Sequence, residues 1–274
     1  MKNVLLFGYG KMGSSIARGW MLKKLDFNIF IIEKEASLRK IATQDGFEAY
    51  ESIDSLNETK KLKNFDIIFL AVKPQQMEET VRSFYNSNLH KSVFVSIAAG
   101  LSFSWFRNKF NKDIKIVRAM PNLPASIGFG VTGYCKSKNL SEEEDKDVNS
   151  LLTAFSKTIY LNNESLIDKV TAISGSGPGY IFYLVEVLSQ IAIDKGFTKK
   201  DAKLLAEETL IGSARLIEAS NIDPKKLKEN VTSPGGTTEA GLLVLQSKKN
   251  GLHPLLKSTI NNAIKRGKEL NFDG

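Results

Sequence analysis

Three glycines near the start of the chain, spaced Gly-x-Gly-x-x-Gly, constrain the fold more than any other feature. Gly8, Gly10 and Gly13 follow the apolar run Val4–Phe7 and open a segment with apolar residues at helical spacing. In a strand–turn–helix unit the first glycine permits the tight turn, and the second lets the backbone approach a pyrophosphate. The third lets the helix pack close to the strand. Because a strand precedes the pattern and a helix follows it, the sequence predicts a dinucleotide-binding α/β domain.

An acidic residue ends the second expected strand, where the ribose of the adenosine would lie. Glu33 comes 20 residues after Gly13 and would accept hydrogen bonds from ribose hydroxyls. Its charge should repel a 2′-phosphate and favours NADH. Lys34, with further basic residues nearby, could neutralise that phosphate and favours NADPH. We therefore expect both cofactors to be accepted.

The first half of the chain alternates strands with helical segments, which predicts a doubly wound, mostly parallel sheet of the Rossmann type. A capping-box pattern at Ser141 and Glu144 opens a helix that runs through Phe155. After Val4–Phe7, strands are expected at 28–32, 66–72, 93–97, 115–120 and 158–161.

Beyond about Glu164 the strand patterns stop, and apolar residues recur at three- and four-residue spacing. The sequence therefore predicts an α/β domain over residues 1–162 and an all-helical domain over residues 163–274. The apolar faces of the last four helices are too many for one small domain to bury alone. These helices are expected at 180–195, 199–220, 239–248 and 255–270.

Composition excludes several other classes of protein. The net charge of +8 comes from basic pairs that are scattered and separated by acids, so we expect no nucleic-acid groove. No apolar run is long enough to span a bilayer, and Met1 leads directly into a strand, so we expect a cytoplasmic protein without a membrane partner. Cys135 is the single cysteine, and no cluster of metal ligands is evident.

Two segments rich in serine, threonine and glycine precede expected helices in the second half. They are Ser174–Pro178 and Ser233–Thr238. Each is expected to place hydroxyls and unencumbered backbone N–H groups at a helix start, where the helix dipole favours an anion. One such loop could be an ordinary capped turn, but two of them beside a dinucleotide fold predict a carboxylate site.

Five motifs follow one another along the chain: Gly8–Gly13, Ala71–Pro74, Arg118–Pro124, Ser174–Pro178 and Thr232–Thr238. Together they give the chain a family resemblance that covers nearly its whole length. The chain resembles pyrroline-5-carboxylate reductase, whose members reduce a cyclic imine to L-proline with NAD(P)H. The segment from Thr232 to Thr238 is the most specific part of the resemblance. Glu33 and Lys34 depart from it, because members often carry a polar residue followed by arginine.

The resemblance implies a role for each loop. The hydroxyl of Thr238 would lie at the ring nitrogen of the substrate as the catalytic group. The second domain would be a dimerisation domain whose helices interlock with those of a second subunit and complete its site, with larger rings of dimers in some members. The substrate would bind to Ser176, Ser233, Gly235, Gly236, Thr237 and Thr238. The cofactor, NADPH or NADH, would bind to Gly8, Gly10, Lys11, Met12, Gly13, Glu33, Lys34, Ala71, Val72, Lys73, Pro74, Ala98, Met120 and Asn122.

The motifs contain no histidine or other strong acid, and reduction of an imine does not need one. A protonated imine is already an electrophile, so hydride transfer requires no strong protein acid. Neither His90 nor His253 falls within a motif, and we expect neither to be catalytic.

Two alternatives remain open from the sequence. A β-hydroxyacid dehydrogenase would share the first glycine motif and would use a catalytic lysine near the start of the helical domain. Lys169 is available for that role, but Ile173 stands where the accompanying asparagine is expected. A non-enzymatic sensor of cofactor level would have no use for Ser233–Thr238. Substitution of Thr238 would distinguish both from a reductase.

Overall fold

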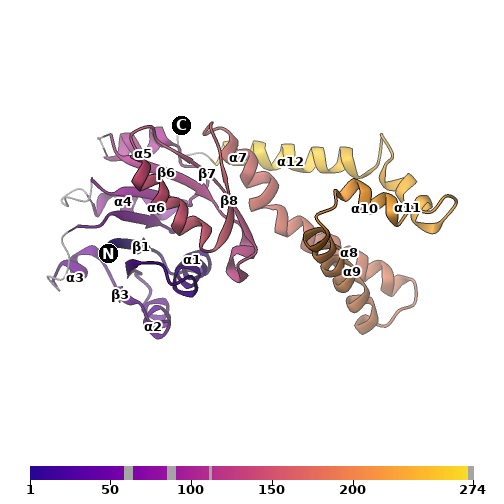
Figure 1. Ribbon diagram of the computed structural model, residues 1–274, viewed down its shortest axis with the longest axis horizontal. Helices are drawn as coiled ribbons and strands as arrows, with labels where there is room; N and C mark the ends of the chain where they lie inside the picture. Colours follow the sequence, from indigo (N-terminus) through magenta and orange to yellow (C-terminus); the bar gives the residue numbers. More distant parts are fainter. Residues whose placement is uncertain (59–63, 85–90, 111–112, 271–274) are drawn as a thin grey trace. The chain divides into compact units, whose positions relative to one another are not determined.

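The computed structural model describes residues 1–58, 64–84, 91–110 and 113–270, and the chain forms two compact units (Figure 1). The first unit comprises Met1–Ser176 with Ile264–Gly274, and the second comprises Gly177–Ala263. The first unit extends past residue 162 because α7 (Leu166–Val170) buries Ile167 against Met120 and Cys135. The functional boundary that the sequence places at residue 162 stays a prediction.

One eight-stranded sheet forms the centre of the first unit, in the order β3-β2-β1-β4-β5-β6-β7-β8. The chain runs outward from β1 to β3 and then returns to β4 on the other side of β1, so strand order reverses between β1 and β4. Ligands of open α/β sheets bind at the carboxyl side of such a reversal. All pairs are parallel except β6 with β7. The strands are β1 (Lys2–Phe7), β2 (Phe27–Ile32), β3 (Glu48–Tyr50), β4 (Ile67–Leu70), β5 (Val93–Ser96), β6 (Lys115–Met120), β7 (Gly130–Lys136) and β8 (Ser156–Tyr160).

Helices cover both faces of the sheet, and β1 shows why. Its alternate residues Val4 and Leu6 belong to one apolar cluster, which α1 and α6 complete, whereas Leu5 and Phe7 belong to a second, which α4 and α5 complete. A strand buried on both faces has to be apolar throughout, as this one is. The helical segments are α1 (Lys11–Leu22), α2 (Ala36–Gln44), α3 (Ile53–Glu58), α4 (Pro74–Arg82), α5 (Phe103–Phe110), η2 (Leu123–Ile127), α6 (Glu142–Thr153), α7 and the π-helical η3 (Thr171–Gly175).

The sheet confirms the predicted fold class and adds two strands that the sequence did not indicate. β3 has only three residues, too few for an alternating pattern. β7 begins with glycine and has a second at Gly133, where a Cβ atom would lie 2.8 Å from a side-chain carbon of Val170. Glycine weakens a strand pattern but permits this close approach of α7. The capping box at Ser141 and Glu144 is present as expected.

The second unit is all-helical (Figure 1). Asp223 caps the short helix α10 by accepting the Lys225 N–H at 2.8 Å, and Pro224 lies in its first turn, as the pair Asp223-Pro224 predicts. Large apolar side chains remain exposed along these helices, among them Phe182 and Leu243, while alanines such as Ala202 are buried. A single chain therefore leaves much of this apolar surface uncovered. The helices are α8 (Gly177–Asp194), α9 (Lys199–Ser220), α10 (Pro224–Asn230), α11 (Thr237–Leu245) and α12 (Leu252–Glu269), of which the residues from Ile264 onward belong to the first unit.

Candidate cofactor and substrate sites

The predicted cofactor residues of the first unit follow strands whose carboxyl ends share one edge of the sheet. Parallel pairing from β2 through β1, β4 and β5 to β6 brings these ends together. This edge includes the reversal between β1 and β4. The segments that leave it begin at Gly8, Glu33, Ala71, Ile97 and Pro121.

The glycine-rich turn after β1 has the geometry that a dinucleotide requires. Gly8 has a φ of +93°, and a Cβ atom there would lie 2.7 Å from the carbonyl oxygen of Ala71. A Cβ atom on Gly13 would lie 2.0 Å from the carbonyl oxygen of Gly8, so α1 can pack here only with glycine. Around Gly10, by contrast, no residue other than its two chain neighbours lies within 4 Å of the Cβ position. The turn is closed at its first and third glycines and open at the second, where a pyrophosphate would approach.

Two predicted residues continue from this turn into α1. Lys11 is the first residue of the helix and its side chain is exposed. Met12 is half-buried and packs on the apolar cluster beneath the turn. No side chain caps α1, because its N-cap residue is Gly10, so the first N–H groups of the helix face the open position.

Glu33 is held by the backbone on both sides of its carboxylate. Its Oε2 accepts the Tyr9 N–H at 2.6 Å, and its Oε1 accepts the Glu35 N–H at 2.9 Å. The carboxylate is therefore fixed beside the glycine-rich turn. Each carboxylate oxygen can accept a second hydrogen bond, so a ribose hydroxyl remains compatible with this arrangement.

Two basic residues after β2, Lys34 and Arg39, are already paired with acids or carbonyls. Lys34 forms an ion pair with Glu79, in which the two side chains are 65% and 71% exposed. Arg39 donates to the carbonyl oxygens of Glu33 and Lys34 and also faces Glu51. An exposed pair of this kind contributes little, so Lys34 can exchange Glu79 for another anion.

The turns after β4 and β5 border the same edge. Lys73 is the N-cap of α4, and Pro74 occupies the first turn of that helix. The Lys73 side chain is exposed, whereas Ala71 and Val72 are half-buried against Gly8. Ala98 is buried, and its N–H donates to the Ser96 hydroxyl at 3.3 Å.

Met120 and Asn122 end this edge at β6. Both are almost completely buried, and the Asn122 Oδ1 accepts the Val131 N–H at 2.9 Å. Asn122 therefore holds the start of β7 against the turn after β6. Two residues before Met120, on the same face of β6, the buried Arg118 side chain makes an ion pair with the partly exposed Glu164 at 2.6 Å.

In the second unit, the segment Ser233–Thr238 forms a tight turn that leads into α11. Gly235 has a φ of +70°, and its N–H donates to the Glu239 carboxylate at 2.7 Å. The Gly236 N–H donates to the Ser233 carbonyl at 3.0 Å. Thr237 and Thr238 are exposed at the first two positions of α11, where helix geometry supplies no acceptor for their N–H groups. This turn offers the hydroxyls and amides that a carboxylate requires.

The expectation for the other serine-rich segment was wrong in one respect. Ser174–Pro178 is not a loop before a helix, because η3 follows α7 directly and α8 begins at Gly177. The Ser176 N–H donates to the Thr171 carbonyl at 2.8 Å, so this amide is not free for an anion. A π-helical turn within a longer helical run often marks a functional site. Its packing also brings Gly175 within 3.8 Å of Met120, measured from the Cβ position.

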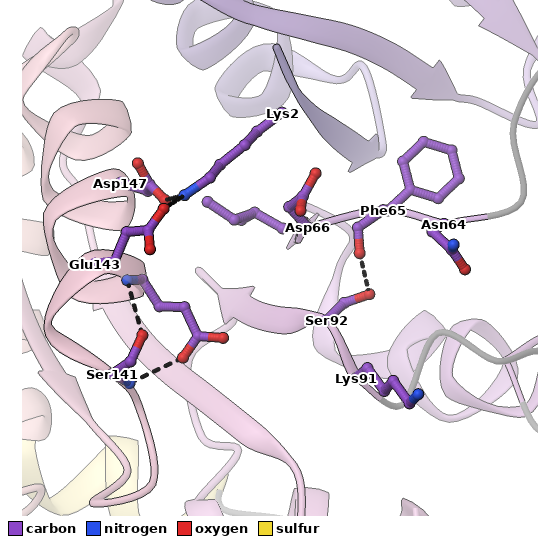
Figure 2. Close-up of a pocket in the computed structure, with 11 residues that line it drawn as sticks. Lys2, Asn64, Phe65, Asp66, Lys91, Ser92, Ser141, Glu143 and Asp147 are labelled. Atoms are coloured by element: carbon purple, nitrogen blue, oxygen red, sulfur yellow. Dashed lines mark hydrogen bonds and ion pairs between the residues drawn. The ribbon is translucent and has the colours of Figure 1, made fainter.

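A cavity of about 840 Å³ lies at the opposite edge of the sheet, near the amino ends of β1, β4 and β5 (Figure 2). Lys2 bonds to Glu143 and Asp147 there, and these bonds raise the pKa of the Lys2 ammonium. The Ser92 hydroxyl donates to the Phe65 carbonyl, as Figure 2 shows. This cavity is remote from the glycine-rich turn and shares none of the predicted site residues.

The remaining predicted features have simple outcomes. His253 lies in the first turn of α12, and His90 lies outside the described residues. Among the residues that the structure describes, no cluster of three or more potential ligands could hold a metal ion. Within the same residues, no helix combines the length and the apolar character needed to cross a membrane.

The fold and the open glycine-rich turn define an NAD(P)-dependent oxidoreductase of the Rossmann type. Residues 3–100 match the family described as NADP oxidoreductase, coenzyme F420-dependent, and residues 164–270 match the family described as pyrroline-5-carboxylate reductase dimerisation. The enzyme of this name from Aquifex aeolicus is 33% identical over 265 residues, which cover 97% of this chain and 96% of the relative. The chain therefore belongs to the pyrroline-5-carboxylate reductase family, and it uses NAD(P)H.

Solved structures agree with this assignment. The pyrroline-5-carboxylate reductase from Coxiella burnetii superposes with a TM-score of 0.88 at 30% identity, over 98% of both chains. The Plasmodium falciparum pyrroline carboxylate reductase, solved with NADP bound, gives 0.80 at 27% identity, again over 98% of both chains. The sensor and β-hydroxyacid dehydrogenase alternatives are set aside by this full-length match.

Proposed function

We propose that the protein reduces L-1-pyrroline-5-carboxylate to L-proline, using hydride from NADPH or NADH. Family membership over nearly the whole chain carries this proposal. Bound NAD(P)H supplies the hydride, which adds to the carbon of the C=N bond, while the ring nitrogen keeps the proton of the iminium and becomes an amine. Because the iminium is already electrophilic, the residues have to bind, orient and exclude water, and no strong protein acid is needed.

The cofactor residues proposed from the sequence act through different parts of the backbone and side chains. Gly10 leaves room for the pyrophosphate beside the first N–H groups of α1. Glu33 presents its fixed carboxylate to the adenosine ribose. Lys34 is exposed and can turn from Glu79 towards a 2′-phosphate. The remaining contacts are proposed at Lys11, Met12, Ala71, Val72, Lys73, Pro74, Ala98, Met120 and Asn122.

The substrate residues divide into those that bind and those that shape the turn. The Thr237 and Thr238 amides, together with the Ser233 hydroxyl, are proposed to bind the carboxylate of the imine. Gly235 and Gly236 already donate their N–H groups within the turn, so their main contribution is its conformation. The Thr238 hydroxyl is proposed to lie at the ring nitrogen. Ser176 is proposed to bind the substrate through its hydroxyl alone, since its N–H already donates to the Thr171 carbonyl.

The second unit is proposed to form a homodimer with interlocked helical domains and a site shared between subunits. The dimerisation family covers residues 164–270, and exposed apolar side chains such as Phe182 and Leu243 need a partner. A larger ring of dimers, a cytoplasmic location and the absence of membrane or nucleic-acid partners stay predictions.

The direct test follows loss of reduced-nicotinamide absorbance with pyrroline-5-carboxylate, in separate assays with NADPH and NADH. Imine-dependent oxidation that yields proline would support the proposal. The ratio of the specificity constants for NADPH and NADH shows whether the effect of Lys34, which favours NADPH, or that of Glu33, which favours NADH, is larger. We expect both cofactors to be used. A preference of several thousandfold would contradict that expectation. No oxidation by protein that binds cofactor would refute the proposed reaction.

A further inference from the structure

The residue between the first two glycines has a buried aromatic side chain that the cofactor motif does not explain. Tyr9 is only 1% exposed and packs in the apolar cluster beneath α1, with its ring edge-on to Phe47 at a centroid distance of 6.0 Å. Its hydroxyl donates to the Asp45 Oδ2 at 2.6 Å. Burial and the neighbouring carboxylate raise the pKa of the Tyr9 phenol, so this hydroxyl stays a donor.

Asp45 occupies a position that is unfavourable for an isolated carboxylate. It is the C-cap of α2, where the helix dipole repels negative charge. Two partners compensate for this, because Arg18 of α1 donates to the same oxygen, with Nε at 2.9 Å. The hydrogen bond from Tyr9 lowers the pKa of Asp45 most, and the hydrogen bond from Arg18 lowers it further. The end of α2, the second half of α1 and the glycine-rich turn are thereby joined at one carboxylate.

The same tyrosine is also fixed through its backbone. Its N–H donates to the Glu33 Oε2 at 2.6 Å, and the preceding Gly8 N–H donates to the Ile32 carbonyl at 2.8 Å. The residue is thus held at both ends, immediately before the open position at Gly10. Any shift of the Tyr9 ring would move the Gly10 amide and the Glu33 carboxylate together.

From this geometry we infer that Tyr9 and Asp45 act as one positioning pair for the cofactor. The pair fixes the glycine-rich turn and the Glu33 carboxylate in the conformation that binds the pyrophosphate and the adenosine ribose. The inference rests on the proposed cofactor site. It assigns a function to Asp45, which lies 35 residues beyond Gly10 and belongs to no nucleotide-binding motif.

The test is a double-mutant cycle measured by fluorescence titration with NADPH and with NADH, without imine. Tyr9→Phe keeps the ring and removes the donor, and Asp45→Ala removes the acceptor. Each is expected to raise Kd about fivefold to tenfold, where tenfold is about 1.4 kcal/mol. The double variant should bind no more weakly than Asp45→Ala alone, because that variant already lacks the bond that Tyr9→Phe removes. At saturating cofactor, kcat and the KM for imine should stay unchanged.

Tyr50→Phe is the matched control, because the Tyr50 hydroxyl also donates to a carboxylate, the Glu48 Oε2 at 2.6 Å. Its Kd for cofactor should equal that of the wild type. If the pair has only a structural role, the Tyr9 and Asp45 variants will have a lower Tm but an unchanged Kd for cofactor, and that result would overturn the inference. Additive increases of Kd in the double variant would overturn it as well. If Tyr9→Phe fails to fold, the Kd of Asp45→Ala decides, since the Asp45 side chain is partly exposed, at 23%. Wild-type protein that bound neither cofactor would refute the cofactor site itself.

Discussion

The buried ion pair between Arg118 and Glu164 gives the sharpest stability prediction. The Arg118 side chain is 7% exposed and that of Glu164 is 29% exposed. One oxygen of Glu164 accepts both from the Arg118 guanidinium at 2.6 Å and from the Phe103 N–H at 2.7 Å. Glu164→Ala would therefore leave a buried guanidinium and a backbone donor without this acceptor.

Breaking a fully buried pair costs about 3–5 kcal/mol, because an uncompensated charge remains. Water reaches part of Glu164, so we expect about 2–4 kcal/mol for Glu164→Ala. The double variant Arg118→Met with Glu164→Ala should lose less, since it leaves no buried charge behind. Asp113→Ala removes the exposed pair with Arg107 and serves as the control, with an expected loss of at most about 0.5 kcal/mol.

The assay is urea denaturation followed by tryptophan emission. Both tryptophans of the chain, Trp20 and Trp105, are buried in the first unit, so their emission reports the unit that contains the pair. With an m-value of about 2 kcal/mol per molar, Glu164→Ala should lower the midpoint by about 1–2 M. A midpoint within about 0.3 M of the wild type would refute the reasoning. A double variant less stable than Glu164→Ala would refute it as well.

Three further predictions concern the site. Thr238→Ala should lower turnover about tenfold to a hundredfold while NAD(P)H affinity stays nearly unchanged, because one hydrogen bond to a charged group is worth roughly 1.5–3 kcal/mol. Gly10→Val should abolish cofactor binding in a fluorescence titration, because its side chain would fill the open position of the turn. The pKa of Asp45 is lower in the folded state than in the unfolded chain, so ionised Asp45 stabilises the fold. This contribution to stability is complete above the unfolded pKa of about 3.9 and is lost as the pH falls through the folded pKa.

Each of these has a contrary outcome. Unaltered steady-state kinetics in Thr238→Ala would remove that hydroxyl from the mechanism. Retained binding by Gly10→Val would refute the assignment of the turn. For Asp45, the urea midpoint of the wild type should exceed that of Asp45→Asn at about pH 6, and the gap should narrow below about pH 4. A gap that widened on acidification would contradict the sign of the pKa shift.

Much of the fold follows from local sequence because the signals are local. The apolar run of β1, the glycine spacing after it and the capping box at Ser141 each predict structure within one turn or one strand. β7 escaped prediction because its two glycines weaken the strand pattern. Gly133 is required by the close approach of Val170 in α7, which lies far along the chain, and Gly130 by that of Ala125. The π-helical turn at Thr171–Gly175 escaped because glycine and serine indicate a loop unless packing holds them in a helix.

The candidate site divides in the same way. The glycine-rich turn and the segment Ser233–Thr238 were visible because backbone conformation and capping depend on neighbouring residues. The sequence by itself thus determined the fold class, the cofactor class and the family. Only the tertiary structure decided which groups join Tyr9 to Asp45 and Arg118 to Glu164, since these pairs are 36 and 46 residues apart. Such contacts depend on how the sheet brings distant segments together, which no local pattern encodes.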